Sequence, residues 1–415
     1  MTLAWCLTRL LTLGVLFAYE GPRGALGDVG YFSESLRGLS DGTLAGTLTE
    51  YPLPAVGVVA LPFLCAALLG SVDLYGPLLI GAALLVDGAF TAFLYRAAGP
   101  TRTRAVVLWL AAVPALGGIT FARFDLLTGV LVAAAVLLVA QRPWLAAAAV
   151  SVATAIKLWP VLLIPATVAA ARRRLPPALV VLVIGALLAG GTVLLAGWAR
   201  LLSPLTYQTD RGLQIESVAA TPAMAAWALA PDSWKITFSA FRAFEISGPG
   251  VEALLLATNV LTALLGVGLV AVWWRAFARR DPLTPQALVW VSLAATIGFV
   301  VAGKVLSPQY LLWLLPVAAG GLALGGISSR SLWRWSLVLL AATALTHLVY
   351  PVLYRGLVEH SAWSLPAVLV LVVRNLLLLW LAGWAWWRAW VALSPGDRPS
   401  GSRDPRPEQV AHSAG

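Results

Sequence analysis

Long apolar runs separated by short polar breaks occupy most of this 415-residue chain. A run of about 18 or more apolar residues with few charges is long enough to cross a bilayer as a helix. The pattern therefore predicts an all-α fold, a polytopic transmembrane bundle of about twelve helices. The expected spans are 3–19, 53–70, 74–95, 105–122, 126–140, 144–160, 176–196, 251–274, 286–303, 310–326, 333–350 and 364–390.

Two long polar interruptions break this pattern, at 20–52 and 197–250. In the first, the stretch "YFSESLRGL" puts Tyr31, Phe32, Ser35 and Leu39 at near-helical spacing, which suits a short helix lying on a membrane surface. In the second, aromatic residues alternate with polar ones, as is typical of an interfacial segment. The membrane domain is expected to cover 1–390, followed by a polar, Pro/Gly/Ser-rich, disordered cytoplasmic tail over 391–415.

Lys and Arg in the short loops indicate the orientation, because cytoplasmic loops retain an excess of positive charge. With both chain ends cytoplasmic, the predicted inner loops hold twelve such residues and the short outer loops six. The stretch "RAAGPTRTR" at 96–104 argues the other way. This orientation places Lys157 near the cytoplasmic end of its span, and it places both long loops outside a cell membrane.

Composition excludes several classes of function. Hydrophobic residues make up 60% of the chain and charged ones 11%, so the net charge of +10 is distributed over loops and does not indicate nucleic-acid binding. Cys6 and Cys65 lie in apolar segments and suggest no disulfide framework. No metal-ligand spacing, phosphate-binding loop or nucleophile elbow is present, so no cofactor and no metal site are predicted, although a divalent metal stays open.

Candidate chemistry begins in the first long loop. Asp28 opens the amphipathic stretch within "DVGY", which also contains Tyr31, and Glu50 closes the loop before Pro52. A carboxylate held just above a membrane by structured neighbours is suited to general-base catalysis. The alternative is that these are ordinary acids of a surface loop.

A second group of polar residues is predicted at the outer mouth of a helix. The stretch "KVLSPQYLLWLLP" contains Lys304, Ser307, Gln309 and Tyr310, and Pro308 signals the start of a helix. Free N–H groups at a helix start, together with a lysine, suit a phosphate. A snorkelling lysine beside a capping serine explains the same pattern equally well.

Three further sites remain open at this point. Asp87 and Arg374 lie within apolar spans, where a charge is expensive, and they are either functional or paired with each other. His347 lies near an outer helix end and either contacts a substrate or is a satisfied buried histidine. The stretch "RGLQIES" contains Arg211, Gln214 and Glu216 and is either a solvated loop or a grip on a polar ligand.

The order of these features resembles the polyprenol-phosphate-sugar-dependent glycosyltransferases of the C-type superfamily, and most closely glycosyltransferase family 87. The stretches that carry the resemblance are "DVGY", "EYP", "RFDLLTGVLVAAAVL", "VSVATAIKLWPVLLIP", "RGLQIES" and "SPQYLLWLLP", within about 28–375. Actinobacterial mannosyltransferases of lipoglycan assembly belong to this family. They often carry histidines near the position of Gln309 and Tyr310, so this chain departs from their pattern there.

The resemblance implies an inverting transfer of a hexose, mannose in the first instance, on the outer membrane face. The donor would be a polyprenyl-phosphate sugar and the acceptor a lipid-linked or membrane-attached glycan, surrounded by membrane lipids. Asp28 would be the general base, and Lys304, Arg211 and Ser307 would bind the donor phosphate. The residues left to contact sugar or acceptor are Tyr31, Glu50, Gln214, Glu216, Gln309 and Tyr310.

Two other classes of protein compete with this interpretation. A lipid or glycolipid transporter would show internal repeats or broken helices near the midplane, and no clear repeat is visible in the sequence. A non-catalytic membrane scaffold would leave Asp28 and Arg211 without a chemical purpose. The oligomeric state is not predicted.

Overall fold

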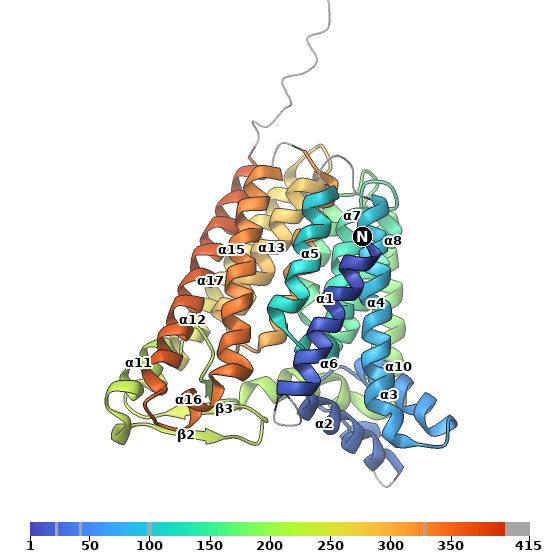
Figure 1. Ribbon diagram of the computed structural model, residues 1–415. Helices are drawn as coiled ribbons and strands as arrows, with labels where there is room; N and C mark the ends of the chain where they lie inside the picture. Colours follow the sequence, from blue (N-terminus) through green and yellow to red (C-terminus); the bar gives the residue numbers. More distant parts are fainter. Residues whose placement is uncertain (21–23, 41–43, 98–101, 327–328, 395–415) are drawn as a thin grey trace, which may run out of the picture.

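The computed structural model describes residues 1–20, 24–40, 44–97, 102–326 and 329–394. Figure 1 shows a helical bundle in which the N-terminus and the end of α17 lie at one end, here called the terminus end, and the short helices and strands lie at the other, here called the loop end. The predicted all-α bundle is confirmed. The predicted tail lies outside the described residues from 395 onward.

The longest helices form the walls of the bundle. Among the described residues, seven helical segments are long and apolar enough to cross a membrane. They are α1 (Thr2–Val15, continued by a π turn over Leu16–Glu20), α4 (Tyr75–Ala97), α10 (Leu175–Thr209), α12 (Val251–Ala278), α13 (Pro285–Ala302), α15 (Ser329–His347, continued by a π turn over Leu348–Val352) and α17 (Ser364–Ala392).

Shorter elements fill the space between these helices and cover the loop end. The shorter apolar helices are α3 (Leu53–Leu68), α5 (Arg102–Leu116), α7 (Asp125–Leu138), α8 (Pro143–Ile156), α9 (Ile164–Ala169, after a 3-10 turn η5 over Trp159–Leu163) and α14 (Leu315–Leu324, after a 3-10 turn η7 over Pro308–Trp313). The remaining helices are α2 (Leu26–Arg37), α6 (Ile119–Ala122), α11 (Thr221–Leu229) and α16 (Tyr354–Val358), and further 3-10 turns are η2 (Gly38–Ser40), η3 (Leu44–Gly46), η4 (Val72–Leu74) and η6 (Pro231–Ser233).

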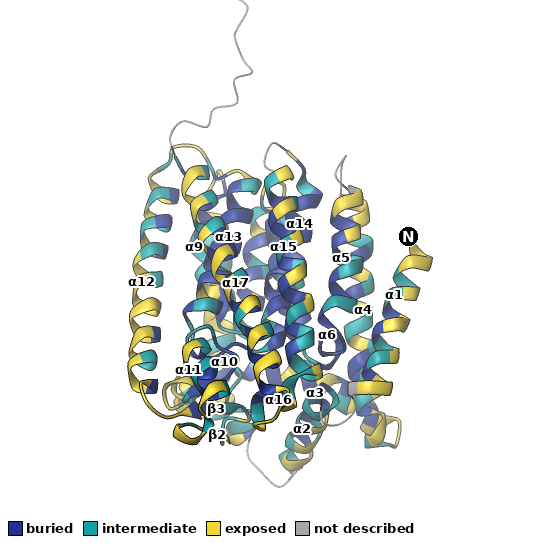
Figure 2. Ribbon diagram, turned by 60° about the vertical axis from the view of Figure 1, so that its left-hand side comes forward, coloured by how far each residue is buried: buried dark blue, intermediate teal, exposed yellow. Residues whose placement is uncertain are grey.

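The distribution of burial fits a bundle surrounded by lipid. Helix α13 is buried along most of its length, whereas the outer faces of α10 and α12 are apolar and exposed (Figure 2). Leu194 on α10 is 88% exposed and Trp274 on α12 is 75% exposed. Water would disfavour such surfaces, and hydrocarbon chains solvate them, so the exposed apolar faces support a membrane protein.

A small sheet in the second long loop is not predicted by the sequence pattern. Strands β1 (Leu213–Gln214), β3 (Phe244–Ser247) and β2 (Lys235–Phe238) pair antiparallel in the order β1-β3-β2. With α11, α16 and the loop end of α17 they enclose a second hydrophobic core that includes Met224, Trp227 and Ile246. The predicted end of the span before 197 coincides with a break in α10 at Gly197 (φ 83°), but the chain after this break is helical as far as Thr209, which the sequence does not predict.

Helix α3 is not a span, which corrects the predicted topology. Tyr51, just before α3, accepts a hydrogen bond from Arg123, which pairs with Asp28 of α2. Asp73, just after α3, lies 3.7 Å from Arg37 at the end of α2. Both ends of α3 therefore lie at the loop end, beside α2 (Figures 1 and 2).

An additional crossing after Lys157 replaces the one that α3 does not make. This residue ends α8 in an extended conformation, and the turn η5 and helix α9 lead the chain back toward the terminus end. Every predicted loop between 74 and 160 therefore changes side. Arg96, Arg104 and Arg142 move to the terminus end, while Arg123 and Lys157 move to the loop end (Figure 1).

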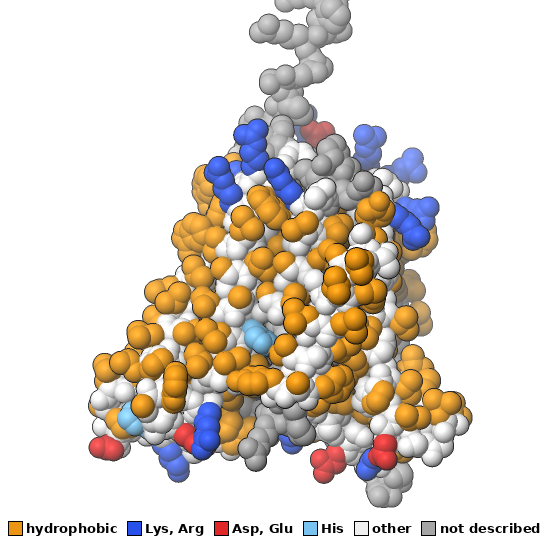
Figure 3. Space-filling model, in the orientation of Figure 1, with side chains coloured by type: hydrophobic (Ala, Val, Ile, Leu, Met, Phe, Trp, Pro, Cys, Tyr) orange, Lys and Arg blue, Asp and Glu red, His pale blue; other side chains and the backbone are white. Residues whose placement is uncertain are grey.

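The corrected topology segregates charge more strongly than the predicted one. Figure 3 shows Lys and Arg gathered at the terminus end, acids and bases mixed at the loop end, and a broad apolar band between them. The sequence "RAAGPTRTR", which contradicts the predicted orientation, now agrees with the other basic loops. The mistake came from counting α3 as a span.

Candidate active site

Asp28 is held by an arginine from a distant part of the chain. Helix α2 buries Val29, Phe32 and Leu36, which leaves Asp28 in its first turn facing α6. The guanidinium of Arg123 donates from Nε to Oδ2 at 2.7 Å, and its Nη2 lies 2.6 Å from Oδ1. This bidentate geometry fixes the carboxylate in one orientation, and the side chain keeps 23% of its surface exposed.

Tyr51 completes this first pair. Its hydroxyl accepts a hydrogen bond of 2.8 Å from Nη1 of Arg123. Burial raises the pKa of Tyr51, so the phenol stays neutral. Burial alone would lower the pKa of Arg123, but the charge of Asp28 more than offsets this and raises it, so the guanidinium stays cationic.

A second ion pair lies beside the first. Lys157 Nζ is 2.6 Å from Oδ1 of Asp125, the residue that opens α7, and the indole N–H of Trp313 donates to the same oxygen at 2.8 Å. Four aromatic rings face the ammonium group at 5.1 to 6.0 Å from their centroids, those of Tyr51, Phe124, Tyr310 and Trp313. Tyr51 therefore touches both pairs, by its hydroxyl and by its ring.

Glu50 and Tyr31 form a third contact at the loop end. The hydroxyl of Tyr31 donates to Oε1 of Glu50 at 2.6 Å, and burial together with this bond raises the pKa of Tyr31. Arg242, from the turn between β2 and β3, lies over the Tyr31 ring at 4.2 Å. The second long loop thus reaches the first at this point.

The polypeptide around Glu50 is held from below by Arg200 of α10. Its guanidinium donates to the carbonyl oxygens of Thr47, Leu48 and Tyr51. The side chain is 2% exposed, so it is a structural cap for this turn and not a ligand-facing cation.

Arg211, in the second long loop, and Lys304, before η7, supply further positive charge at the loop end. The guanidinium of Arg211 lies beside the edge-to-face pair of Tyr207 and Phe241, 6.0 and 5.9 Å from their ring centroids, and its Nε is buried without a hydrogen-bond partner. Lys304 Nζ donates to the carbonyl of Thr209 at 3.0 Å. Burial and the neighbouring charge of Arg211 lower the pKa of Lys304.

Tyr310 is in range of both groups of charged residues. It stacks on Trp313 at a centroid distance of 4.0 Å, and its phenol is in electrostatic range of Arg211, Asp125 and Arg123. Tyr310 is thus near residues of both groups, Arg123 on the side of Asp28 and Arg211 beside Lys304.

Gln214 and Glu216 lie beneath this region and support it. Gln214 is 3% exposed; its Oε1 accepts from the N–H of Leu306 at 2.7 Å, and its backbone N–H donates to the carbonyl of Lys304. Glu216 is 1% exposed, and burial raises its pKa to about 7. Their burial favours a supporting role rather than the predicted contact with sugar hydroxyls.

Arg374 and Asn375 of α17 hold the same segment from the bundle side. Arg374 Nη2 donates to the carbonyl of Glu216 at 2.9 Å, and Asn375 donates to the carbonyl of Ser217 and to the hydroxyl of Thr221. Arg374 does not pair with Asp87, so that predicted contact is wrong. Through these hydrogen bonds, the stretch "RGLQIES" connects α17 with the segment before η7.

Ser307 and Gln309 differ from expectation in their local structure. Ser307 precedes a six-residue 3-10 turn and not an α-helix, because α14 begins only at Leu315. The predicted helix start at Pro308 is confirmed, with Ser307 at the N-cap, but the helix that starts there is this short 3-10 turn. Gln309 is 5% exposed and lies under the surface of the site.

Asp87 and His347 lie away from this region. Asp87 accepts hydrogen bonds from Arg9, Trp5 and Trp109 inside the bundle. Nδ1 of His347 lies 3.0 Å from the carbonyl of Leu116, which explains the histidine as a contact between α15 and α5.

Four site residues receive no chemical role from the sequence: Arg123, Asp125, Lys157 and Tyr51. The sequence does carry a signal for them, since "RFD" and "AIKLWP" each put charge beside apolar runs. The mistaken side assignment hides that signal, because it places Arg123 and Lys157 on the face opposite Asp28.

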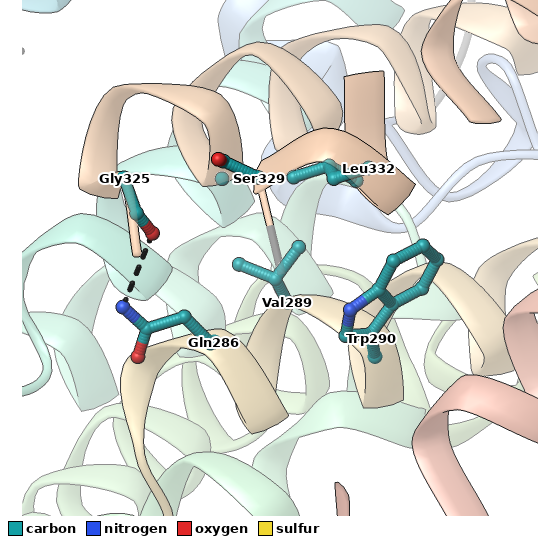
Figure 4. Close-up of a pocket in the computed structure, with 7 residues that line it drawn as sticks. Gln286, Val289, Trp290, Gly325, Ser329 and Leu332 are labelled. Carbon is teal, nitrogen blue, oxygen red and sulfur yellow. Dashed lines mark hydrogen bonds between the residues drawn. The ribbon is translucent and has the colours of Figure 1, made fainter. Parts of the chain in front are cut away.

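Neither pocket found in the bundle belongs to this site. One is lined by Trp380, Gly383, Trp384 and Trp387 on the outer face of α17. Figure 4 shows the other, at the terminus end, where Gln286 donates to the carbonyl of Gly325 at 3.3 Å. Among the described residues, no three of His, Cys, Asp or Glu come together in a way that could hold a metal ion.

Comparison with known proteins gives one match. The family model of glycosyltransferase family 87 matches residues 51–303, which include Tyr51, Arg123, Asp125, Lys157 and Arg211. Asp28 precedes the matched region and Lys304 directly follows it. No curated protein and no solved structure matches the chain.

Proposed function

The chain belongs to glycosyltransferase family 87, and from this premise we propose that it transfers mannose from a polyprenyl-phosphate donor to a membrane-attached glycolipid or glycan. The transfer inverts the anomeric carbon and takes place at the loop end, on the extracytoplasmic face of the cell membrane. Asp28 is the general base.

The proposed step balances as a single displacement. Asp28 takes the proton of the acceptor hydroxyl while that oxygen attacks the anomeric carbon of the donor. The bond between this carbon and the phosphate oxygen breaks on the opposite face. The polyprenyl phosphate leaves with an additional negative charge, which oriented cations stabilise in the transition state.

The positions of the cations support this assignment of roles. Arg123 orients Asp28 and is occupied by it, so the donor phosphate falls to Arg211 and Lys304. Neither of these two cations forms an ion pair within the described residues, and Arg211 Nε lacks a hydrogen-bond partner. Ser307 and Tyr310 lie next to them and complete the proposed phosphate side.

Tyr31 and Glu50 are placed for the acceptor. They lie on the same loop as Asp28, and their polar atoms pair with each other at the loop end. A sugar hydroxyl approaching Asp28 meets these two side chains first. Gln214, Glu216 and Gln309 act from below by holding the turn that carries Lys304 and Tyr310.

The orientation rests on positive charge. Lys and Arg gather at the terminus end (Figure 3). The loops there lie before α10, after α12 and around the start of α15, and they contain Arg172 to Arg174, Arg279, Arg280 and Arg334. Cytoplasmic loops are enriched in Lys and Arg, which assigns the loop end to the outer face. A polyprenyl-phosphate donor is confined to the bilayer, and this location lets its phosphate reach the site without leaving the lipid.

One observation carries the proposal: a partly exposed carboxylate held by an arginine stands at the same end of the bundle as two unpaired cations. The test is transfer of radiolabel from polyprenyl-phosphate-mannose to membrane lipids by the purified protein. Removing a general base costs about 10²- to 10⁴-fold, so Asp28→Asn should lose transfer by that factor. Asp232→Asn, an exposed carboxylate of the same end, should keep wild-type activity.

Each part of the proposal has its own contrary result. Full transfer by Asp28→Asn overturns the general-base role. Transfer only from another polyprenyl-phosphate hexose overturns mannose, and retention at the anomeric carbon of the product overturns inversion. Flux of labelled glycolipid across vesicles without any transfer identifies a transporter instead.

A further inference from the structure

The pair Asp125–Lys157 has no part in the proposed displacement, yet it is among the most enclosed charge pairs at the loop end. Asp125 is 0% exposed and Lys157 14% exposed. Burying two charges and surrounding one with four aromatic rings needs a reason, because hydrophobic residues of similar volume would be at least as stable there.

The position of Arg123 supplies that reason. Arg123 and Asp125 are separated only by Phe124, and the guanidinium is in electrostatic range of both Asp28 and Asp125. Two carboxylates therefore compete for one arginine. Oδ2 of Asp125 is buried without a hydrogen-bond partner, so this carboxylate still has an acceptor to offer.

We infer that Lys157 is a positioning residue: it neutralises Asp125 and thereby leaves Arg123 free to orient Asp28. The inference rests on the proposed role of Asp28. Lys157 reaches no reacting atom in this scheme and acts through two other side chains. Its aromatic surroundings hold the ammonium at Asp125, since cation–π contacts gain strength when water is excluded.

The geometry around Asp125 favours Lys157 over other partners. Trp313 and Lys157 both donate to Oδ1 of Asp125, which holds this carboxylate oxygen beside the aromatic rings that surround the ammonium group. Tyr51 occupies the space between the pairs, with its hydroxyl on Arg123 and its ring over Lys157. Loss of the ammonium removes the charge that keeps Asp125 in this position.

The inference predicts a compensating pair of substitutions. Lys157→Met keeps the length of the stem and its packing on the rings but leaves Asp125 without a cation. A displacement of a catalytic group by about 1 Å costs about 10²-fold, so this variant should lose kcat by that order with little change in KM for the donor. Adding Asp125→Asn removes the competitor and should return kcat to within about tenfold of wild type. The Asn side chain can still accept from Trp313.

The control variant is Lys235→Met, which removes an exposed lysine from the loop end and should leave kcat unchanged. If the double variant stays as inactive as Lys157→Met while both remain folded, Lys157 does not act through Asp125. A tenfold rise in donor KM in Lys157→Met, without loss of kcat, would make Lys157 a ligand of the substrate instead.

A second measurement does not depend on the proposed reaction. The coupling between Asp28 and Arg123 in thermal stability is obtained from Asp28→Asn, Arg123→Met and the double variant. This coupling should shrink in the Lys157→Met background and return in Lys157→Met/Asp125→Asn. An unchanged coupling would overturn the inference even if the protein transfers no sugar, whereas failure of transfer alone would overturn only the proposed function.

Discussion

Two buried ion pairs of this chain have the same chemistry and different surroundings. Arg9 and Asp87, between α1 and α4, are 2% and 0% exposed, and the Asp87 carboxylate accepts four hydrogen bonds, two from Arg9 and one each from Trp5 and Trp109. Asp28 is paired with Arg123 in the same bidentate way, but it is 23% exposed, and among the described residues its carboxylate accepts from the guanidinium alone.

Under the proposed function, this difference separates a structural pair from the pair that holds the general base. A carboxylate whose acceptor positions are all occupied takes up a proton only by breaking a bond within the protein. The Asp28 carboxylate keeps free lone pairs and an open side, so it can accept a proton while Arg123 still holds it. Partial saturation, and not the presence of a charge inside the bundle, marks the reactive site.

The largest expected effects come from changing the same atom in the two pairs. Asp87→Asn leaves Arg9 uncompensated in a closed interior, and breaking a buried pair in this way costs about 3–5 kcal/mol of stability. The melting temperature in detergent should fall sharply, while transfer per folded molecule stays at the wild-type level.

Asp28→Asn should show the opposite result, a folded protein with little transfer. Measuring melting temperature and transfer on the same preparations checks the comparison. If Asp87→Asn lost transfer without losing stability, the two pairs would not differ in the way their hydrogen bonds indicate.

The second prediction sharpens the comparison with a carboxylate that is buried and incompletely bonded. Burial raises the pKa of Glu216 to about 7 from 4.5, so the folded protein binds its proton more tightly than the unfolded chain does. This contribution to stability is fully present below pH 4.5 and is lost as the pH rises through 7. At 1.36 kcal/mol per pH unit, the loss is about 3 kcal/mol.

Glu216→Gln should remove that pH dependence, because the amide does not titrate. The check is the melting temperature of both proteins between pH 4.5 and 8, with Glu359→Gln at an exposed position as the control. The same slope in wild type and Glu216→Gln would show that another group is responsible.

Sequence patterns predict the bundle well because lipid imposes a simple rule, namely that each span needs a long apolar run. They also predict a helix at α2 from the spacing of Tyr31, Phe32, Ser35 and Leu39, although of these only Phe32 is buried. The rule fails at α3, which has a fully apolar sequence but begins and ends at the loop end. That single error reverses the side of Arg123 and Lys157 and hides half of the site.

Other parts of the site depend on contacts that no local pattern encodes. Gln214 reads as a solvated polar residue, but its amide oxygen bonds to Leu306 some ninety positions later. The pairing of Asp87 with Arg9 instead of Arg374 depends on which helices are neighbours. Such choices are decided by tertiary packing, so sequence supplies the candidates and not the partners.

The last and smallest expected effect concerns the backbone contact between α7 and η7, near the Asp28–Arg123 pair. Gly129 of α7 meets η7 so closely that an added Cβ would overlap the carbonyl oxygen of Leu312, next to the Trp313 that bonds to Asp125. Gly129→Ala must push η7 away from α7, and overpacking of this kind costs about 1–3 kcal/mol. Because the displaced turn carries Trp313 and Tyr310, transfer should fall as well as stability.

The matched control is Gly190→Ala on α10, where an added Cβ meets nothing within 4 Å and should improve helix stability slightly. Melting temperature and transfer are again measured together. If Gly129→Ala lowered stability but left transfer unchanged, the contact between α7 and η7 would be structural only, like the Arg9–Asp87 pair. A loss of both stability and transfer would show that this contact also positions side chains of the proposed site around Asp28 and Arg123.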